Sequence, residues 1–583
     1  MSIPLFTNGQ KSGVTLNTLR DVATKNNIKL APEDEQAYLT VLQGAEMTSQ
    51  TVFDLPDYVD PRLAPVPTVG GERTYWRSAS NSLNAWSHQC NLQAENPVSD
   101  LLKGRTVVVK DNYSVGGLPY TAGIPAKLLS KDGVYPISQI DAPTVQRVLE
   151  AGATLRGTST CENYSLCPMS YTSANGAVHN PWLPNYNTGG SSSGSACLLA
   201  LRNAREAGVP GLENAGDDID LAMGGDQAAS IRVPASYCGV YGLKPTHGLV
   251  PYTGIAGLHP MIDYSGPMAR TVEDIALLLT AVAGYDGLDP RMNAEAPLRD
   301  QVKSYHKELK DFTDSNMKGR GLRVGIISES LTLPGTEPEV AAVVKEAATR
   351  HFTEAGATVS EVSVPMHLLG PLIWMAAVRN HMAKLSVGGR VPDILHHNMP
   401  HFTPRWPPDQ EMYEELTNGN PAVLTVIFGE TFLSERFGME VQAKAHRHVF
   451  ELRAAYDRVL QDYDILITPT AHTVAPPHPD MRAEKDGGSS VMDKLKLAIG
   501  STSNTNPFNA SGHPALSVPC GWATAADGKS KLPVGMQIIG KRWDEMGVLK
   551  AAKAFEQGGG GLGKWPGLAT VEGSSTLTCS ASK

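Results

Sequence analysis

The chain has 583 residues, 41% of them hydrophobic and 19% charged, and its net charge is −9. A mildly acidic chain without a basic stripe is not typical of a nucleic-acid-binding protein. The chain has no run of about 18 apolar residues, so no membrane span is predicted. We therefore expect a globular protein with a large core, no nucleic-acid partner and no membrane contact.

Seven cysteines, odd in number and scattered, predict neither a disulfide framework nor a zinc site. The N-terminal segment lacks the basic-then-apolar pattern of a secretion signal. Both observations favour a cytoplasmic protein.

The predicted elements indicate an α/β fold. Residues 1–100 are interpreted as helices and irregular linkers, with an extended proline-rich connection over 55–71. Continuous apolar runs typical of buried strands follow at 106–109, 153–157, 322–327, 357–364, 465–467, 515–518 and 534–539. Helices are predicted over 271–283, where Thr271 and Asp274 are spaced like a capping box, and over 337–354 and 434–460.

Three regions are predicted. Residues 1–74 form a helical and extended region packing on the core, 75–556 form one large domain, and the glycine-rich stretch 557–583 forms a flexible tail. Residues 380–408, rich in His, Pro and Gly, are a candidate lid or pocket wall, and the polar stretch 203–218 is a candidate surface excursion.

The first segment with chemical potential is the apolar strand that ends in Lys110. Burial disfavours the ammonium form, so we expect the pKa of this lysine to be lowered and the neutral amine to accept a proton near pH 7. The alternative is a strand-end lysine that reaches out to water.

Two small-residue segments follow. Residues 189–195, Gly-Gly-Ser-Ser-Ser-Gly-Ser, precede an apolar helical stretch, which favours an ordered loop at a helix start over a flexible linker. Residues 224–235 place Ser230 after a tight turn whose N–H groups can converge as an oxyanion hole. This turn is not the G-x-S-x-G elbow, and no histidine completes a Ser–His–Asp set.

In this order the three segments resemble the amidase signature family. Supporting matches are PYTAG at 119–123, HNPW at 179–182, GLKP at 242–245, YDILITPT at 463–470, PFN at 507–509 and GHPA at 512–515. The resemblance covers about residues 75–556, and GLVPYTG at 248–254 is most similar to the microbial amidases found beside nitrile-degrading enzymes. It implies a central mixed β-sheet covered by helices on both faces, with no metal and no cofactor.

The resemblance also implies a Ser–Ser–Lys relay. Ser230 would accept the acyl group, Ser191 would be the bridging serine on a cis peptide bond, and Lys110 would be the base. The implied reaction is hydrolysis of a small-molecule carboxylic amide to a carboxylate and ammonia or an amine.

The implied oxyanion hole consists of the N–H groups of Gln227, Ala228, Ala229 and Ser230. The family usually has two glycines where this chain has Ala228 and Ala229. We expect the turn to form with negative φ there, so that the two methyl groups narrow the pocket.

The resemblance aligns residues 169–175 with the pocket wall of relatives. The candidate substrate-binding residues are Met169, Ser170, Tyr171 and Gly190.

Other polar groups have structural interpretations. We expect Asp226 and Arg232 to brace the turn, and His396, His397 and His401 to be structural or pocket-lining because no carboxylate or cysteine completes a ligand set.

Several alternatives remain open. The same triad could cleave a carbamate or an ester, or the chain could be the glutamine-hydrolysing component of a transamidation complex. A non-catalytic scaffold is supported only by the alanine pair. Cys161 and Cys238 could suggest a cysteine hydrolase, but the apolar run around Cys238 favours a buried, inert thiol. A homodimer is also possible.

Overall fold

The structure is a computed structural model that describes residues 12–390, 394–482 and 484–567. The chain divides into two compact units, with the boundary after Pro61 rather than after residue 74. In the first unit, α1 (Leu16–Lys25) and α2 (Glu35–Phe53) are joined by the ion pair between Arg20 and Glu35 at 2.7 Å. The predicted packing of this region on the core stays a prediction.

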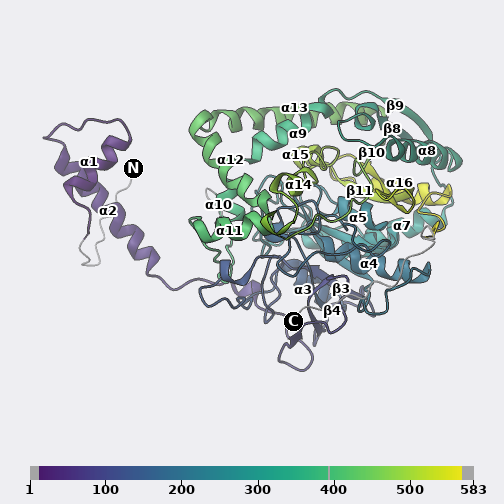
Figure 1. Ribbon diagram of the computed structural model, residues 1–583, viewed down its shortest axis with the longest axis horizontal. Coiled ribbons are helices and arrows are strands. Elements are labelled where there is room, and N and C mark those ends of the chain that lie inside the picture. Colours follow the sequence, from purple (N-terminus) through teal and green to yellow (C-terminus); the bar gives the residue numbers. More distant parts are fainter. Residues whose placement is uncertain (1–11, 391–393, 483, 568–583) are drawn as a thin grey trace. The chain divides into compact units, whose positions relative to one another are not determined.

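The second unit is built on a mixed sheet that has twelve strands within the described residues (Figure 1). In order across the sheet these are β1 (Tyr75–Trp76), β2 (Trp86–Leu92), β4 (Thr154–Ser159), β3 (Thr106–Lys110), β5 (Leu221–Asp226), β7 (Tyr264–Ala269), β6 (Tyr241–Lys244), β11 (Ala515–Thr524), β12 (Lys531–Ile539), β10 (Ile465–Pro469), β8 (Arg323–Ile327) and β9 (Thr358–Val362). Neighbours are parallel from β4 to β5 and from β10 to β9, and antiparallel between β5 and β10.

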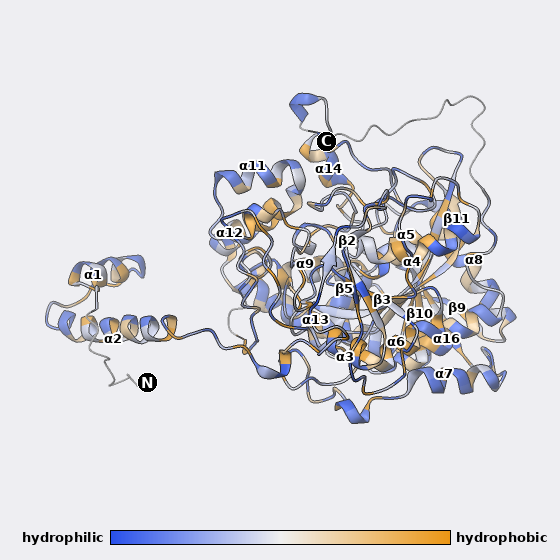
Figure 2. Cartoon of the chain, turned by 90° about the horizontal axis from the view of Figure 1, so that it is seen from below, coloured by the Kyte–Doolittle hydropathy of each residue, from blue (hydrophilic) through white to orange (hydrophobic). Residues whose placement is uncertain are grey.

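Helices cover this sheet, which confirms the predicted α/β class with a central mixed sheet. They are α3 (Pro143–Glu150), α4 (Ser193–Glu206), α5 (Arg232–Cys238), α6 (Val272–Val282), α7 (Tyr305–Asp314), α8 (Pro338–Glu354), α9 (Met366–Val378), α10 (Met382–Ser386), α11 (Gln410–Gly419), α12 (Pro421–Phe437), α13 (Glu440–Asp462), α14 (Val491–Lys496), α15 (Asn506–Ser511) and α16 (Glu545–Gln557). Helices such as α7 and α11 are largely hydrophilic (Figure 2). None of the helices in the described ranges is long and apolar enough to cross a membrane.

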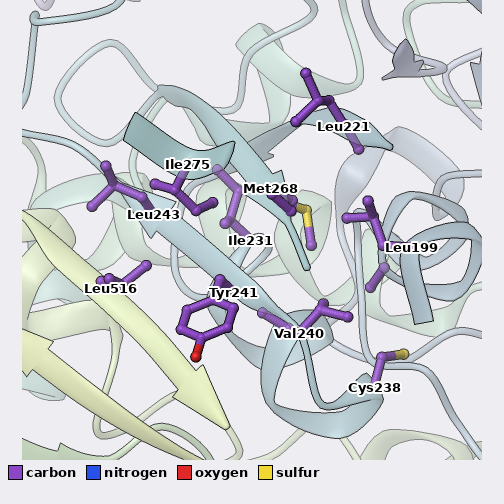
Figure 3. Close-up of a cluster of buried hydrophobic side chains, with 14 of the residues drawn as sticks. Leu199, Leu221, Ile231, Cys238, Val240, Tyr241, Leu243, Met268, Ile275 and Leu516 are labelled. Atoms are coloured by element: carbon purple, nitrogen blue, oxygen red, sulfur yellow. The ribbon is translucent and has the colours of Figure 1, made fainter. Parts of the chain in front are cut away.

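Ile231, the residue after Ser230, is fully buried in the core (Figure 3). Three neighbouring strands, β5, β7 and β6, each place a glycine against this side chain. A Cβ at Gly224 or Gly242 would lie 2.9 Å from an Ile231 methyl or methylene carbon, and one at Gly266 would lie 3.1 Å from its Cδ1. The glycines therefore let Ile231 sit directly on the sheet, which fixes the turn that carries Ser230.

All seven predicted strands are present, and α6 begins as predicted because Thr271 Oγ1 accepts a hydrogen bond from the Asp274 N–H at 3.2 Å. The single helix predicted over 434–460 is wrong. The chain forms α12 and α13 instead, separated at Gly438 with φ +58°, a conformation that ends a helix. The interpretation of residues 1–100 as helices and linkers also missed β1 and β2.

Contacts of the second unit extend beyond both ends of the predicted large domain, whose boundaries stay a prediction. Arg73 belongs to the second unit and forms a 2.7 Å ion pair with the buried Asp141. Beyond α16, Leu562 and Trp565 pack against the core, so the first part of the predicted tail is folded. Residues 568–583 lie outside the described residues.

Candidate active site

Lys110 ends β3 in the middle of the sheet, where its side chain is completely buried. Its Nζ donates a hydrogen bond to Ser191 Oγ at 2.8 Å. Burial lowers the pKa of Lys110 to about 8, partly opposed by the nearby thiol of Cys161 and carboxylate of Asp226. The predicted depression of the pKa is therefore confirmed, and the alternative of a lysine that reaches water is wrong.

Ser191 is held by a loop in which both glycines are required. Gly189 has φ +73°, and a Cβ at Gly190 would lie only 2.4 Å from the Met169 carbonyl oxygen. The Gly190–Ser191 peptide bond is cis, as the resemblance implied. Helix α4 begins two residues later, which confirms an ordered loop at a helix start.

Ser230 lies in the turn between β5 and α5, beside the Ser191 loop. The Ser192 N–H donates a hydrogen bond to the Ser230 carbonyl at 3.2 Å and ties the two segments together. Ser230 is 7% exposed, whereas Ser191 is completely buried, so Ser230 is the one that a ligand can reach. Within the described residues, the two hydroxyl groups are not hydrogen-bonded to each other.

The turn around Ser230 presents unused N–H groups. No described residue accepts a hydrogen bond from the backbone N–H of Gln227, Ala228, Ala229 or Ser230. Neither alanine has positive φ, which confirms that the turn forms without the two glycines that the family usually has. Adjacent free donors of this kind can stabilise a negatively charged oxygen.

Asp226 and Arg232 brace this turn from below, as predicted. Both side chains are completely buried and their ion pair measures 2.8 Å. Asp226 also accepts a hydrogen bond from the Ile231 N–H at 3.1 Å and from Asn509 Nδ2 at 2.8 Å, while Arg232 donates to Gln537 Oε1 at 2.7 Å. The pKa of Asp226 is lowered because the neighbouring guanidinium outweighs the effect of burial.

We expect Arg232→Met to destabilise the fold strongly, because it leaves the Asp226 carboxylate buried without its cation. Removing one partner of a buried ion pair costs about 3–5 kcal/mol of unfolding free energy. Urea unfolding measures this loss. The matched control is Arg350→Met, which removes an exposed ion pair with Glu354 at 3.1 Å and should cost about 1 kcal/mol or less. Equal losses in the two variants would contradict the bracing role.

Glu162 is a site residue that sequence analysis missed. Its carboxylate is completely buried and accepts hydrogen bonds from Ser193 Oγ at 2.8 Å and from Thr172 Oγ1 at 2.6 Å. Burial raises the pKa of Glu162 to about 7. A Cβ at Gly190 would lie 2.8 Å from Glu162 Cγ, so this carboxylate packs directly beneath the cis peptide bond. No local motif marks it.

A cavity of about 170 Å³ opens over Ser230. Besides residues 227–230, it is lined by Ser165, Leu166, Cys167, Pro168, Leu258, Trp374, Met375, Arg379, Met382, Ala422, Thr425, Val426, Ala498 and Thr502. Met382 lies in segment 380–408, which therefore supplies part of the pocket wall, as predicted. Trp374 of α9 donates a hydrogen bond from Nε1 to the Gln227 carbonyl at 3.1 Å and fixes this wall to the turn.

The four candidate substrate-binding residues are not part of this lining. Ser170 Oγ donates to the Val178 carbonyl at 2.8 Å, and the Tyr171 hydroxyl donates to the Lys494 carbonyl at 2.5 Å. Met169 lines a second cavity of about 240 Å³. Gly190 is fully buried beneath the Ser191 loop. Their role in substrate binding stays a prediction.

The candidate histidines and cysteines considered from the sequence do not line the cavity over Ser230. His396 Nδ1 lies 3.4 Å from Arg291 Nη2, and His401 Nε2 lies 3.2 Å from Ser114 Oγ. Across the described ranges, no cluster of three or more His, Cys, Asp or Glu side chains could hold a metal ion. Burial raises the pKa of both Cys161 and Cys238, which keeps these thiols protonated and poorly nucleophilic.

The site resembles that of the amidase signature enzymes. A buried lysine is hydrogen-bonded to a serine on a cis peptide bond, and a second serine with free N–H groups around it lies next to this pair. The comparison with protein families agrees: the family model described as Amidase matches residues 73–549. The chain therefore belongs to the Amidase family, and it is a hydrolase that acts on the carbon–nitrogen bonds of amides.

Known proteins are similar over most of the chain. An enantioselective amidase from Rhodococcus rhodochrous is 34% identical over 86% of this chain and 87% of its own length. A component of the glutamyl-tRNA(Gln) amidotransferase of Methanosarcina acetivorans is 32% identical over 78% of this chain and 84% of its own. Among solved structures, the peptide amidase from Stenotrophomonas maltophilia has a TM-score of 0.56 at 27% identity, over 78% of this chain and 82% of that one.

Proposed function

We propose that the chain hydrolyses a small carboxylic amide through an acyl-Ser230 intermediate. Neutral Lys110 takes the proton of the Ser191 hydroxyl, and Ser191 takes that of Ser230, whose Oγ attacks the carbonyl carbon. The carbon–nitrogen bond breaks as the proton returns through the same groups to the nitrogen, which leaves as neutral ammonia or amine. Water then attacks the ester carbonyl and gives its proton to the same relay; the bond between the carbon and Ser230 Oγ breaks, the carboxylic acid leaves, and the proton returns to Ser230 Oγ.

The observation that carries this proposal is the 2.8 Å contact between Lys110 Nζ and Ser191 Oγ, where both side chains are completely buried. A lysine with a pKa of about 8 is partly neutral at physiological pH, whereas one with the usual value of 10.5 would hardly be. The free N–H groups of residues 227–230 support the same proposal, since a donor aimed at the oxyanion contributes about 3–4 kcal/mol to transition-state stabilisation.

A second candidate function follows from the similarity to the glutamyl-tRNA(Gln) amidotransferase component, which suggests glutamine as the amide and partner proteins in a complex. The similarity to an enantioselective amidase favours a protein that works without such partners. Hydrolysis by the purified chain alone distinguishes the two.

The carbamate and ester alternatives use the same triad, and a matched panel of amide, carbamate and ester substrates separates them. The homodimer and the cytoplasmic location stay predictions.

The direct test is to trap the acyl-enzyme. The protein is mixed with a panel of amides, quenched in acid, digested and analysed by mass spectrometry. We expect the acyl group on the peptide that contains Ser230 and no adduct in Ser230→Ala. An acyl group on Ser191 or Lys110 instead, or hydrolysis without any adduct in a burst-phase experiment, would contradict the proposed intermediate.

A further inference from the structure

The cavity over Ser230 contains one unusual group, the guanidinium of Arg379. Most of the lining is apolar, and Arg379 supplies the only charged side chain among the described lining residues. It is half-buried at the C-terminal end of α9. Within the described part of the chain, no residue accepts a hydrogen bond from this guanidinium or forms an ion pair with it. Desolvation lowers the pKa of Arg379, and no carboxylate of the described residues opposes this shift.

The position of this arginine is well determined by its neighbours. Met375 and Arg379 are one helical turn apart at the end of α9, and Met382 begins α10 after a break at His381, which has φ +76°. All three residues line the cavity. Trp374 on the same helix is hydrogen-bonded to the Gln227 carbonyl, so the element that presents Arg379 is attached to the turn that carries Ser230. On the opposite wall, α12 has a glycine where the arginine stem lies. A Cβ at Gly429 would be 3.4 Å from Arg379 Cδ and 3.7 Å from Nε.

A purely structural role does not explain this arrangement. A cation at the end of a helix usually donates to the free carbonyl groups of the last turn, but the described residues provide no such acceptor for the Arg379 side chain. Partial burial of an unpaired charge is costly, and an arginine that only packed could be replaced by an apolar residue. The missing partner is therefore expected to arrive with the ligand.

We propose that Arg379 binds an anionic group of the substrate, and that the preferred substrates are amides that carry a carboxylate separated from the scissile bond by an apolar body. The inference rests on the proposed function, because it places this carboxylate in the cavity that Ser230 opens into. The guanidinium forms two parallel hydrogen bonds with a carboxylate, while the apolar wall contacts the chain between the two ends. The carboxylate can belong to the acyl group or to the amine.

The test compares matched charged and neutral amides. For the acyl side, the monoamides of succinic, glutaric and adipic acid are paired with butanamide, pentanamide and hexanamide. For the amine side, N-acetyl-4-aminobutanoate is paired with N-butylacetamide. We expect wild-type kcat/KM to favour the charged member of the best pair by about 10- to 100-fold, the range expected for hydrogen bonds between charged groups in a half-buried site. The side on which this preference appears identifies the part of the substrate that Arg379 binds.

Variants connect the preference to this arginine. In Arg379→Gln the charged-to-neutral ratio should fall to about one or below, and in Arg379→Glu it should reverse in favour of an ammonium-terminated amide such as 6-aminohexanamide. Arg436→Gln, at an exposed position near the end of α12, is the matched control and should keep the wild-type ratio. Titration of Ser230→Ala with adipic acid monoamide and with hexanamide measures the dissociation constants of a charged and a neutral amide without turnover.

The outcomes separate the two proposals. Equal kcat/KM for the charged and neutral members of every pair, or an unchanged preference in Arg379→Gln, would overturn the role of Arg379 while the Ser230 chemistry stands. Normal hydrolysis by Ser230→Ala would overturn the proposed function instead. A charge preference that is also lost in Arg436→Gln would assign it to long-range electrostatics and not to this contact.

Discussion

Replacement of Ser230 by alanine is expected to reduce kcat by at least about 10⁴-fold, because it removes the atom that forms the acyl-enzyme. The Ser230 side chain is small and forms no hydrogen bond with the described residues, so alanine should not affect folding. The remaining rate would come from the N–H groups of residues 227–230 and from substrate positioning, which survive without the nucleophile. Steady-state hydrolysis of the best amide, together with an unfolding curve, measures both quantities.

A second serine in the same region provides the control. Ser195 is completely buried in α4, and its hydroxyl is hydrogen-bonded to Ser159 at 2.7 Å. Ser195→Ala should therefore cost about 1 kcal/mol of unfolding free energy and leave kcat within a few-fold of wild type. Comparable activities for the two variants would show that Ser230 is not the nucleophile.

The parts of the site that sequence analysis identified are those whose chemistry is local. Lys110 could be found because an apolar strand ends in a basic residue, and Ser191 because a glycine pair precedes it. Ser230 lies in a dense run of small residues before Ile231-Arg232. In each case, the residue and the backbone that positions it are adjacent in sequence, and the resemblance then supplied the order of the relay.

The residues that escaped prediction depend on contacts between distant segments. Glu162 matters because it packs under Gly190, and Arg379 because α9 turns its face towards Ser230. Neither relation leaves a periodic or motif-like signal. The candidate wall residues Met169, Ser170 and Tyr171 illustrate the converse, since similarity in sequence position did not place them on the cavity lining.

The fold shows the same division. Strands with a continuous apolar pattern were predicted, whereas β2 was missed because its residues 86–92 include Ser, His, Gln and Asn, although most of them are buried. The apolar stripe of the helix predicted over 434–460 runs only from Val449 to Val459, within α13, so it gave no sign of the break at Gly438, where φ is +58°. Local composition indicates burial or helicity, but tertiary contacts decide where an element stops.

Replacement of Lys110 by methionine is expected to lower kcat/KM by about 10³-fold or more, because it removes the base while keeping the shape of the side chain. The pH profile gives the sharper signature. Since only the neutral amine accepts a proton, wild-type kcat/KM should fall about tenfold per pH unit below a pKa of about 8 and level off above it. The variant should lose this dependence.

Folding stability provides the control for the same variant: Lys110→Met should lower activity but should not lower stability. A lysine whose pKa is about 8 in the folded protein and 10.5 when unfolded destabilises the fold fully below pH 8, and this penalty disappears as the pH rises towards 10.5. Lys110→Met removes the penalty and loses one hydrogen bond, so its urea midpoint at pH 7 should be no lower than that of wild type. If the variant kept an ascending limb centred near pH 7, the base would be Glu162, whose pKa is about 7, and the assignment to Lys110 would be wrong.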